Sequence, residues 1–308
     1  MSFTTTKDRI WIVYDTFAGW LARRSEPLRK IGYWVFGSIL WIAYFMPRST
    51  VRATFRSLSK HVGRDNPRIL FRDYVNGFMR GMNRTEQLRH GYTDAIDEML
   101  KIPEQARLDA LVQKSGVVLV IPHTHGSIVM GRALAQQYRI LALIRTTRNT
   151  RRAASETQIF ENMEEDFVDV RHEKPAVVAR KILKALSERR LIIGMVDRIR
   201  SAPPEEKPID TAEDLVRAQA FGEPIGIAGW PARFAWKAKC PILPVTVDQS
   251  KDGMSLVLGN AVAPTENLSD TTQAWVTELE SLIKSYPDEW AFSLDKHWSR
   301  ILQKSKVD

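Results

Sequence analysis

The chain has 308 residues, of which 44% are hydrophobic and 26% are charged, the composition of an ordinary globular protein. This length is enough for one large domain or two modest ones. A single cysteine, Cys240, excludes an internal disulfide and fits a reducing compartment. The formal net charge of +9 predicts an anionic partner, which leaves nucleic acid, a membrane surface and an acidic carrier protein as candidates.

Most of the excess charge lies at the N-terminal end. Residues 1–60 contain ten Lys or Arg against three Asp or Glu, together with four of the nine tryptophans. Basic residues mixed with Trp and Tyr around an apolar segment are typical of a membrane interface. A nucleic-acid partner is disfavoured, because the sequence has no zinc-knuckle spacing, no aromatic strand of an RNA-recognition module and no basic leucine zipper.

The first two predicted helices form the membrane-associated part. Residues 9–23 are amphipathic, and Asp15 within them argues against a secretory signal. Residues 31–46 are uncharged, but sixteen helical residues span about 24 Å, short of a hydrocarbon core of about 30 Å. We therefore expect an anchor embedded in one leaflet or spanning only marginally, with residues 9–60 at the membrane surface. A buried core helix is the alternative.

A basic helix is expected to follow, beginning at Pro47. Its basic residues recur at every fourth position and form one stripe: Arg48, Arg52, Arg56 and Lys60. Such a stripe is either a solvated face or, beside an anchor, a contact for lipid phosphates. Further helices are predicted over residues 65–82, 85–100 and 104–112.

The stretch from Ser115 to Gly131, SGVVLVIPHTHGSIVMG, contains the main candidate site of the sequence. The apolar run 117–121 is typical of a strand buried on both faces of a parallel sheet, and the proline after it ends the strand. His123 and His125 follow at once, before a helix expected from Gly126 to about Gln137. Polar side chains between a strand and a helix mark the usual position of a site in an α/β fold.

Strands and helices alternate from this point onward. Strands are predicted at 117–121, 140–144, 167–170, 191–196 and 242–247, with an edge strand at 255–258. Helices are predicted at 153–164, 175–188, 229–238 and 271–285, with a long polar loop over 199–218. This alternation predicts an α/β fold with a mostly parallel central sheet flanked by helices. We assign residues 1–112 to an N-terminal helical membrane-anchoring region and residues 113–308 to the α/β domain.

Four polar residues follow predicted strands and are expected to share one rim of the sheet: His123, His125, Arg145 and Asp197. A histidine base, a fixed arginine and a carboxylate suit acyl or phosphoryl transfer. A zinc site is a weaker alternative, since two histidines two positions apart on an extended segment point to the same side, but a further ligand is missing. A serine nucleophile is weaker still, because Ser127 lacks the Gly-x-Ser-x-Gly elbow.

Several short blocks together resemble a known family. After the strand that ends in histidine come Arg145-Thr-Thr-Arg148-Asn149, the strand ending at Asp197, and Phe221-Gly222. Gly229-Trp-Pro-Ala-Arg-Phe-Ala, Pro241-Ile-Leu-Pro-Val, Pro287-Asp-Glu-Trp290 and Trp298 follow. In order and spacing they resemble the lipid A late acyltransferases of the lysophospholipid acyltransferase-like superfamily.

The resemblance implies an acyltransferase-like αβα domain at the cytoplasmic face of a bacterial inner membrane, with no cofactor. It implies transfer of an acyl group from acyl carrier protein or acyl-CoA to a hydroxyl or amine of a lipid or glycolipid. A histidine would be the general base. The residues it implies for substrate binding are Arg145, Arg148, Asn149, Arg198, Phe221 and Gly222.

One block departs from the family pattern of a histidine, four residues and then an acid that orients the imidazole. Ile128 and Met130 stand at that spacing from the two histidines. A histidine could work alone, with the other histidine, or with Asp197 reaching across the rim, and we favour such a rebuilt pair. A non-catalytic scaffold or binding subunit at the membrane is the alternative, and a metal-dependent hydrolase is a weaker one.

Overall fold

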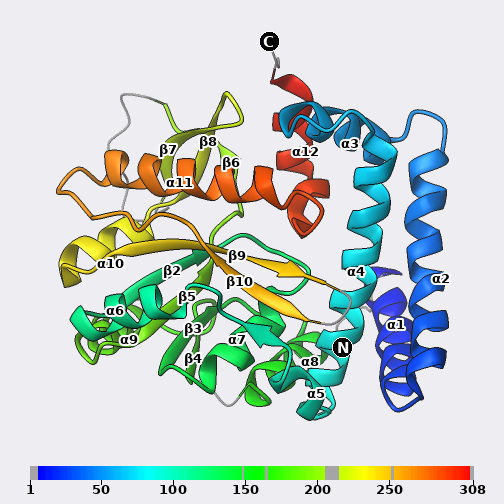
Figure 1. The fold of residues 1–308 in the computed structure, drawn as a ribbon, viewed down its shortest axis with the longest axis horizontal. Helices are drawn as coiled ribbons and strands as arrows, with labels where there is room; N and C mark the ends of the chain where they lie inside the picture. The colour runs from blue at the N-terminus through cyan, green and yellow to red at the C-terminus, as the bar shows by residue number, and fades with distance from the viewer. Residues whose placement is uncertain (1–5, 148, 164–165, 205–214, 251–252, 306–308) are drawn as a thin grey trace.

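The computed structural model describes residues 6–147, 149–163, 166–204, 215–250 and 253–305, and is centred on a seven-stranded sheet (Figure 1). The strand order is β1-β10-β9-β2-β5-β3-β4. Pairing is parallel from β9 through β4 and antiparallel only between β9 and β10. The strands are β1 (Leu100–Lys101), β2 (Val117–Ile121), β3 (Ile140–Ile144), β4 (Asp166–Asp169), β5 (Leu191–Met195), β9 (Ile242–Gln249) and β10 (Met254–Leu258).

Both faces of the sheet are buried, which explains the uninterrupted apolar runs. In β2 the side chains of Val118 and Val120 join one hydrophobic cluster, while Val117, Leu119 and Ile121 join the other. Successive residues of a strand point to opposite faces, so an apolar residue is needed at every position. The predicted α/β fold with a mostly parallel sheet is thereby confirmed.

Helices cover both sides of this sheet (Figure 1). The predicted positions agree with the observed helices to within a few residues. Beyond β1 these are α6 (Gln105–Lys114), α7 (Ser127–Ala135), α8 (Thr150–Glu161), α9 (Pro175–Ser187), α10 (Trp230–Ala238) and α11 (Leu268–Ser285). A 3-10 turn, η1 (Ala291–Leu294), and a last helix, α12 (Lys296–Lys304), follow; neither had been predicted.

The N-terminal region forms a group of helices beside one end of the sheet (Figure 1). It consists of α1 (Thr6–Ala22), α2 (Glu26–Phe45), α3 (Thr50–His61), α4 (Pro67–Arg89) and α5 (Asp94–Asp97). The apolar segment predicted at 31–46 is the larger part of α2. Within the described ranges, no helix combines the length and the hydropathy needed to cross a membrane.

Two expectations for this region were wrong. Helix α3 begins at Thr50 rather than at Pro47, because Ser49 caps it by accepting a hydrogen bond from the Arg52 amide at 3.1 Å. The two helices predicted over 65–82 and 85–100 are instead one long helix, α4, followed by the single turn α5. Its Gly81 does not interrupt the helix but permits close packing, since a Cβ there would lie 2.2 Å from the carbonyl oxygen of His125.

A small second sheet replaces the ends of the predicted polar loop. Its order is β6-β8-β7, with β6 (Arg200–Ser201), β7 (Leu215–Ala220) and β8 (Glu223–Ala228). The middle of that loop, residues 205–214, lies outside the described residues. The strand predicted at 255–258 is β10, and the two-residue β1 pairs only with Met254 and Ser255 on its outer side, so the predicted edge position holds for the rest of the strand.

The N-terminal helices and the sheet share one core. Phe55 of α3 and Phe71 of α4 belong to the same cluster as Val118 of β2, and β1 supplies an outer strand from within residues 1–112. The division of the chain near residue 112 stays a prediction.

Candidate active site

His123 and Asp197, which follow β2 and β5, meet at the sheet rim. These strands are parallel neighbours, with Ile121 paired to Met195, so the residues that follow them leave the sheet on the same side. Nδ1 of His123 and Oδ1 of Asp197 form a hydrogen bond. The expectation that residues at these strand ends share one rim is confirmed for this pair.

Asp197 is completely buried, so its carboxylate needs hydrogen-bond donors in place of water. Besides His123, it receives the indole N–H of Trp290, whose Nε1 lies 2.9 Å from Oδ2. The indole N–H of Trp298 donates to the backbone carbonyl of Asp197 at 2.7 Å. Two tryptophans thus fix the side chain and the backbone of one acid.

His123 is held in place but remains accessible. Its side chain is 18% exposed, and its ring stacks on Phe292 with 3.7 Å between centroids and 5° between planes. Because Asp197 engages Nδ1, the proton belongs on that nitrogen and Nε2 keeps its lone pair. This arrangement can take a proton from a hydroxyl or an amine, which is the role of a general base.

The segment after α11 holds the histidine loop through backbone hydrogen bonds. The amide of Ala291 donates to the His123 carbonyl at 2.7 Å, and the amide of His125 donates to the Glu289 carbonyl at 3.0 Å. Thr124 forms a bridge with Trp290 between these bonds. A loop after a β-strand is thereby given a fixed conformation, which a catalytic side chain requires.

His125 does not share the environment of His123, so the expectation that both rings point to the same side was wrong. The His125 ring packs edge-on against Tyr74 of α4, with 4.7 Å between centroids. Its Nε2 is shielded from solvent and has no hydrogen-bond partner among the described residues. Burial, and secondarily Arg80, lower the pKa of His125 to about 3. A neutral, enclosed ring fits a packing role, and it is His123 that contacts Asp197.

The predicted anion-binding block follows β3, the next strand beyond β5. Arg145 is exposed at the end of β3. Asn149 caps α8, since its side chain accepts a hydrogen bond from the Arg152 amide at 3.1 Å. Arg148 lies outside the described residues. A substrate-binding role for these three residues stays a prediction.

The remaining predicted binding residues lie at different distances from the dyad, the pair His123 and Asp197. The Arg198 guanidinium lies 5.6 Å from the centroid of Phe292, the ring on which His123 stacks. Phe221 and Gly222 form the turn between β7 and β8, with φ of 51° and 76°. Phe221 is buried and stacks on Trp290 at 5.8 Å. Arg198 therefore lies beside the dyad, whereas Phe221 packs against Trp290, which donates to Asp197.

Three residues of the site had not been assigned a role: Trp290, Phe292 and Trp298. The Pro-x-x-Trp block and the later Trp had been noted only as family resemblances. The indole of Trp290 donates to the carboxylate of Asp197 and the indole of Trp298 to its backbone carbonyl, about a hundred residues earlier in the chain, which no local pattern indicates. A signal did exist, because tryptophan side chains are highly buried on average, so Trp290 and Trp298 each predict a buried contact.

The buried His125 makes stability depend on pH. Its folded pKa lies below the ordinary value of 6.5, so it contributes stability that is present above about pH 6.5 and lost as the pH falls toward 3. His125→Gln cannot take up that proton. Between pH 7 and 5 the free energy of unfolding should therefore fall more steeply in the wild type than in the variant, by up to about 1.4 kcal/mol per pH unit.

Urea unfolding at a series of pH values measures both slopes. The matched control is His172→Gln, which removes a histidine whose side chain is 59% exposed; the difference in slope from the wild type should be larger for His125→Gln than for this control. Equal slopes for wild type and His125→Gln would contradict the enclosed, neutral state of His125.

Comparison with known proteins agrees with the geometry. The family model of bacterial lipid A biosynthesis acyltransferases matches residues 65–300, which includes the dyad, both supporting tryptophans and all strands of the central sheet. No curated protein matches the chain. The matched range covers most of the sequence, and the chain therefore belongs to the bacterial lipid A biosynthesis acyltransferase family.

Proposed function

We propose that this protein transfers an acyl group from the thioester of acyl carrier protein or acyl-CoA to a hydroxyl or amine of a membrane lipid or glycolipid, with His123 as the general base. Family membership makes it an acyltransferase that acts on lipid. The observation that carries the finer proposal is the hydrogen bond between His123 and the buried Asp197. Asp197 takes the place of the acid that the residues after the histidine do not supply.

The proposed reaction follows from this geometry. Nε2 of His123 accepts the proton of the acceptor group, whose oxygen or nitrogen attacks the thioester carbonyl carbon. The C–S bond then breaks, and the departing thiolate takes the proton back from His123. Asp197 stabilises the positively charged imidazolium between these two steps. Arg198, beside the dyad, suits the phosphates of the donor or the developing oxyanion.

Substitution of His123 tests the proposal. His123→Ala removes the base, and the rate of transfer should fall by at least about 100-fold. The measurement is the passage of labelled acyl groups from acyl carrier protein, or from acyl-CoA, into extracted membrane lipid.

His172→Ala is the control, since that histidine is exposed and distant in sequence from the site. A folded His123→Ala protein that transfers at the wild-type rate would overturn the proposed base. A wild-type protein that transfers from neither donor while His123→Ala retains the cellular role would favour the scaffold.

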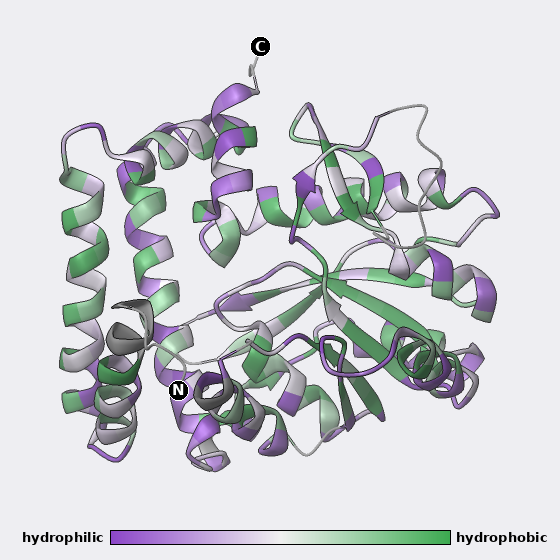
Figure 2. Cartoon of the chain, turned by 180° about the vertical axis from the view of Figure 1, so that it is seen from behind, coloured by the Kyte–Doolittle hydropathy of each residue, from purple (hydrophilic) through white to green (hydrophobic). Residues whose placement is uncertain are grey.

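We further propose that α1 and α2 lie on the cytoplasmic face of the bacterial inner membrane. Large apolar side chains are exposed along both helices, and α2 carries hydrophobic residues along its length at the edge of the molecule (Figure 2). Ile31, Trp34 and Ile42 are 62%, 65% and 65% exposed. A large exposed apolar surface marks a membrane or protein contact. We call this exposed apolar surface the membrane face. Besides Ile31, Trp34 and Ile42, it consists of Val13, Phe17, Trp20, Leu28, Val35, Ile39, Phe45 and Met46.

Membrane binding should depend on this face. The triple variant Ile31→Ser, Trp34→Ser and Ile42→Ser should bind vesicles of phosphatidylethanolamine and phosphatidylglycerol at least about 100-fold more weakly, because each buried side chain of this size contributes about 1.5–3 kcal/mol. Co-sedimentation with the vesicles measures the difference.

A control triple removes exposed apolar side chains elsewhere on the surface: Tyr92→Ser, Val170→Ser and Trp236→Ser, whose residues are 48%, 40% and 43% exposed. This protein should bind like the wild type. Equal losses in both triples would contradict a specific membrane face.

A further inference from the structure

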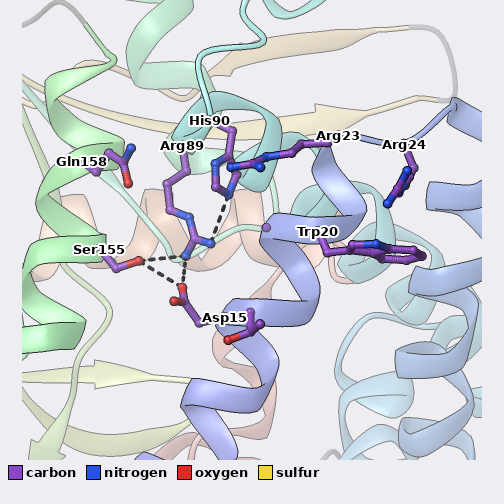
Figure 3. A pocket seen from close by; sticks show the side chains of 10 residues that line it. Asp15, Trp20, Arg23, Arg24, Arg89, His90, Ser155 and Gln158 are labelled. Atoms are coloured by element: carbon purple, nitrogen blue, oxygen red, sulfur yellow. Dashed lines mark hydrogen bonds and ion pairs between the residues drawn. The ribbon is translucent and has the colours of Figure 1, made fainter.

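A cavity lies between α1, the C-terminal end of α4 and α8 (Figure 3). Its volume is about 440 Å³. Among the described residues, neither the dyad nor any predicted substrate-binding residue lines it. The lining is rich in cations and includes Trp20, Arg23, Arg24, Arg89, His90 and Gln158.

Arg89 lines the cavity and is paired with two carboxylates. Its Nη1 lies 2.6 Å from Oδ1 of Asp15 and 2.9 Å from Oγ of Ser155, and its Nη2 lies 2.8 Å from Oε2 of Glu86. The Arg89 side chain is only 6% exposed. This network fixes the cavity wall and also occupies the two carboxylates that would otherwise repel an anion.

Arg23 and Arg24 are different, because they are exposed and no carboxylate of the described residues lies within ion-pair distance of either. The Arg24 guanidinium lies 4.6 Å above the Trp20 ring, which holds it at the cavity (Figure 3). Arg23 extends toward His90 (Figure 3). Burial, then Arg89 and Arg23, lower the pKa of His90. The cavity thus has a positive potential that a bound anion would offset.

The cavity borders the membrane face. Trp20 lines the cavity and is also 48% exposed on that face, where its ring stacks with Phe17 at 5.8 Å. An anion in the cavity would therefore have apolar surface directly beside it. A charged group joined to an acyl chain matches this combination, because indole rings lie preferentially at the level of lipid headgroups.

We propose that this cavity binds the phosphate group of a membrane lipid at a site separate from the dyad. Arg23 and Arg24 would contact the phosphate oxygens, and Trp20 and Phe17 would contact the attached chain. Arg89 lies eight residues beyond Gly81, the point where α4 touches the histidine loop, or about 12 Å along the helix axis. A lipid held there would fix the orientation of the protein on the membrane.

Calorimetric titration of the full chain tests this proposal without any measurement of acyl transfer. The probes are dihexanoyl phosphatidic acid below its micellar concentration and inorganic phosphate, each at 0.15 M salt. The lipid should bind at least about tenfold more tightly than phosphate, because its chain adds apolar contact. Equal affinities would identify a site for free anions and overturn the proposal.

Two double variants of equal charge separate a local site from diffuse attraction. Arg23→Gln with Arg24→Gln should weaken lipid binding at least about tenfold. Arg180→Gln with Arg189→Gln, two exposed arginines in and just after α9, should leave the affinity within about twofold of the wild type. Equal losses in both, or no heat of binding in the wild type, would overturn the proposal. Unchanged thermal unfolding of both variants would show that a loss of binding is local.

Discussion

The hydrogen bond between His123 and Asp197 is the interaction on which the rest of the site depends. A carboxylate without any exposed surface is stable only when donors replace the water it has lost. Here the donors are an imidazole and an indole, and a second indole holds the backbone of the same residue. The same bonds that make the buried charge tolerable also set the tautomer of the histidine. Stability and chemistry therefore require the same geometry.

Distant parts of the chain converge on this pair. Two parallel strands bring the residues to one rim, α4 packs against the histidine loop through Gly81, and the segment from Glu289 to Trp298 closes over it from the C-terminal side. The N-terminal helices are therefore part of the support of this site. Through α4 they connect the exposed apolar surface of α1 and α2 to the loop that carries His123.

Local sequence patterns predicted the elements whose residue types are determined by their own burial. The run 117–121 was identified residue for residue because a strand buried on both faces admits only apolar side chains. Asp197 was selected because it ends such a strand. The continuous helix α4 was missed because its glycines serve a contact with His125 that only the folded chain reveals. The roles of Trp290 and Trp298 were missed because their partner is about a hundred residues away.

The two histidines illustrate the same limit. Extended-chain geometry suggested that both rings share one side, yet the loop turns at His125 and Gly126, and the rings enter different environments. His123 remains partly exposed beside Phe292, whereas His125 is enclosed against Tyr74. Spacing alone could not distinguish the partly exposed ring that contacts Asp197 from the enclosed ring, because the difference lies in the neighbours that each ring meets.

The central claim is that Asp197 performs the orienting role of an acid that is absent from the histidine block. The most direct measurement is the single-turnover rate of acyl transfer by Asp197→Asn, which keeps the size of the side chain but offers an amide to Nδ1. The account predicts a folded protein whose rate is lower by about 100-fold to 10,000-fold, because the imidazole would take the wrong tautomer. A folded Asp197→Asn protein with the wild-type rate would contradict the account.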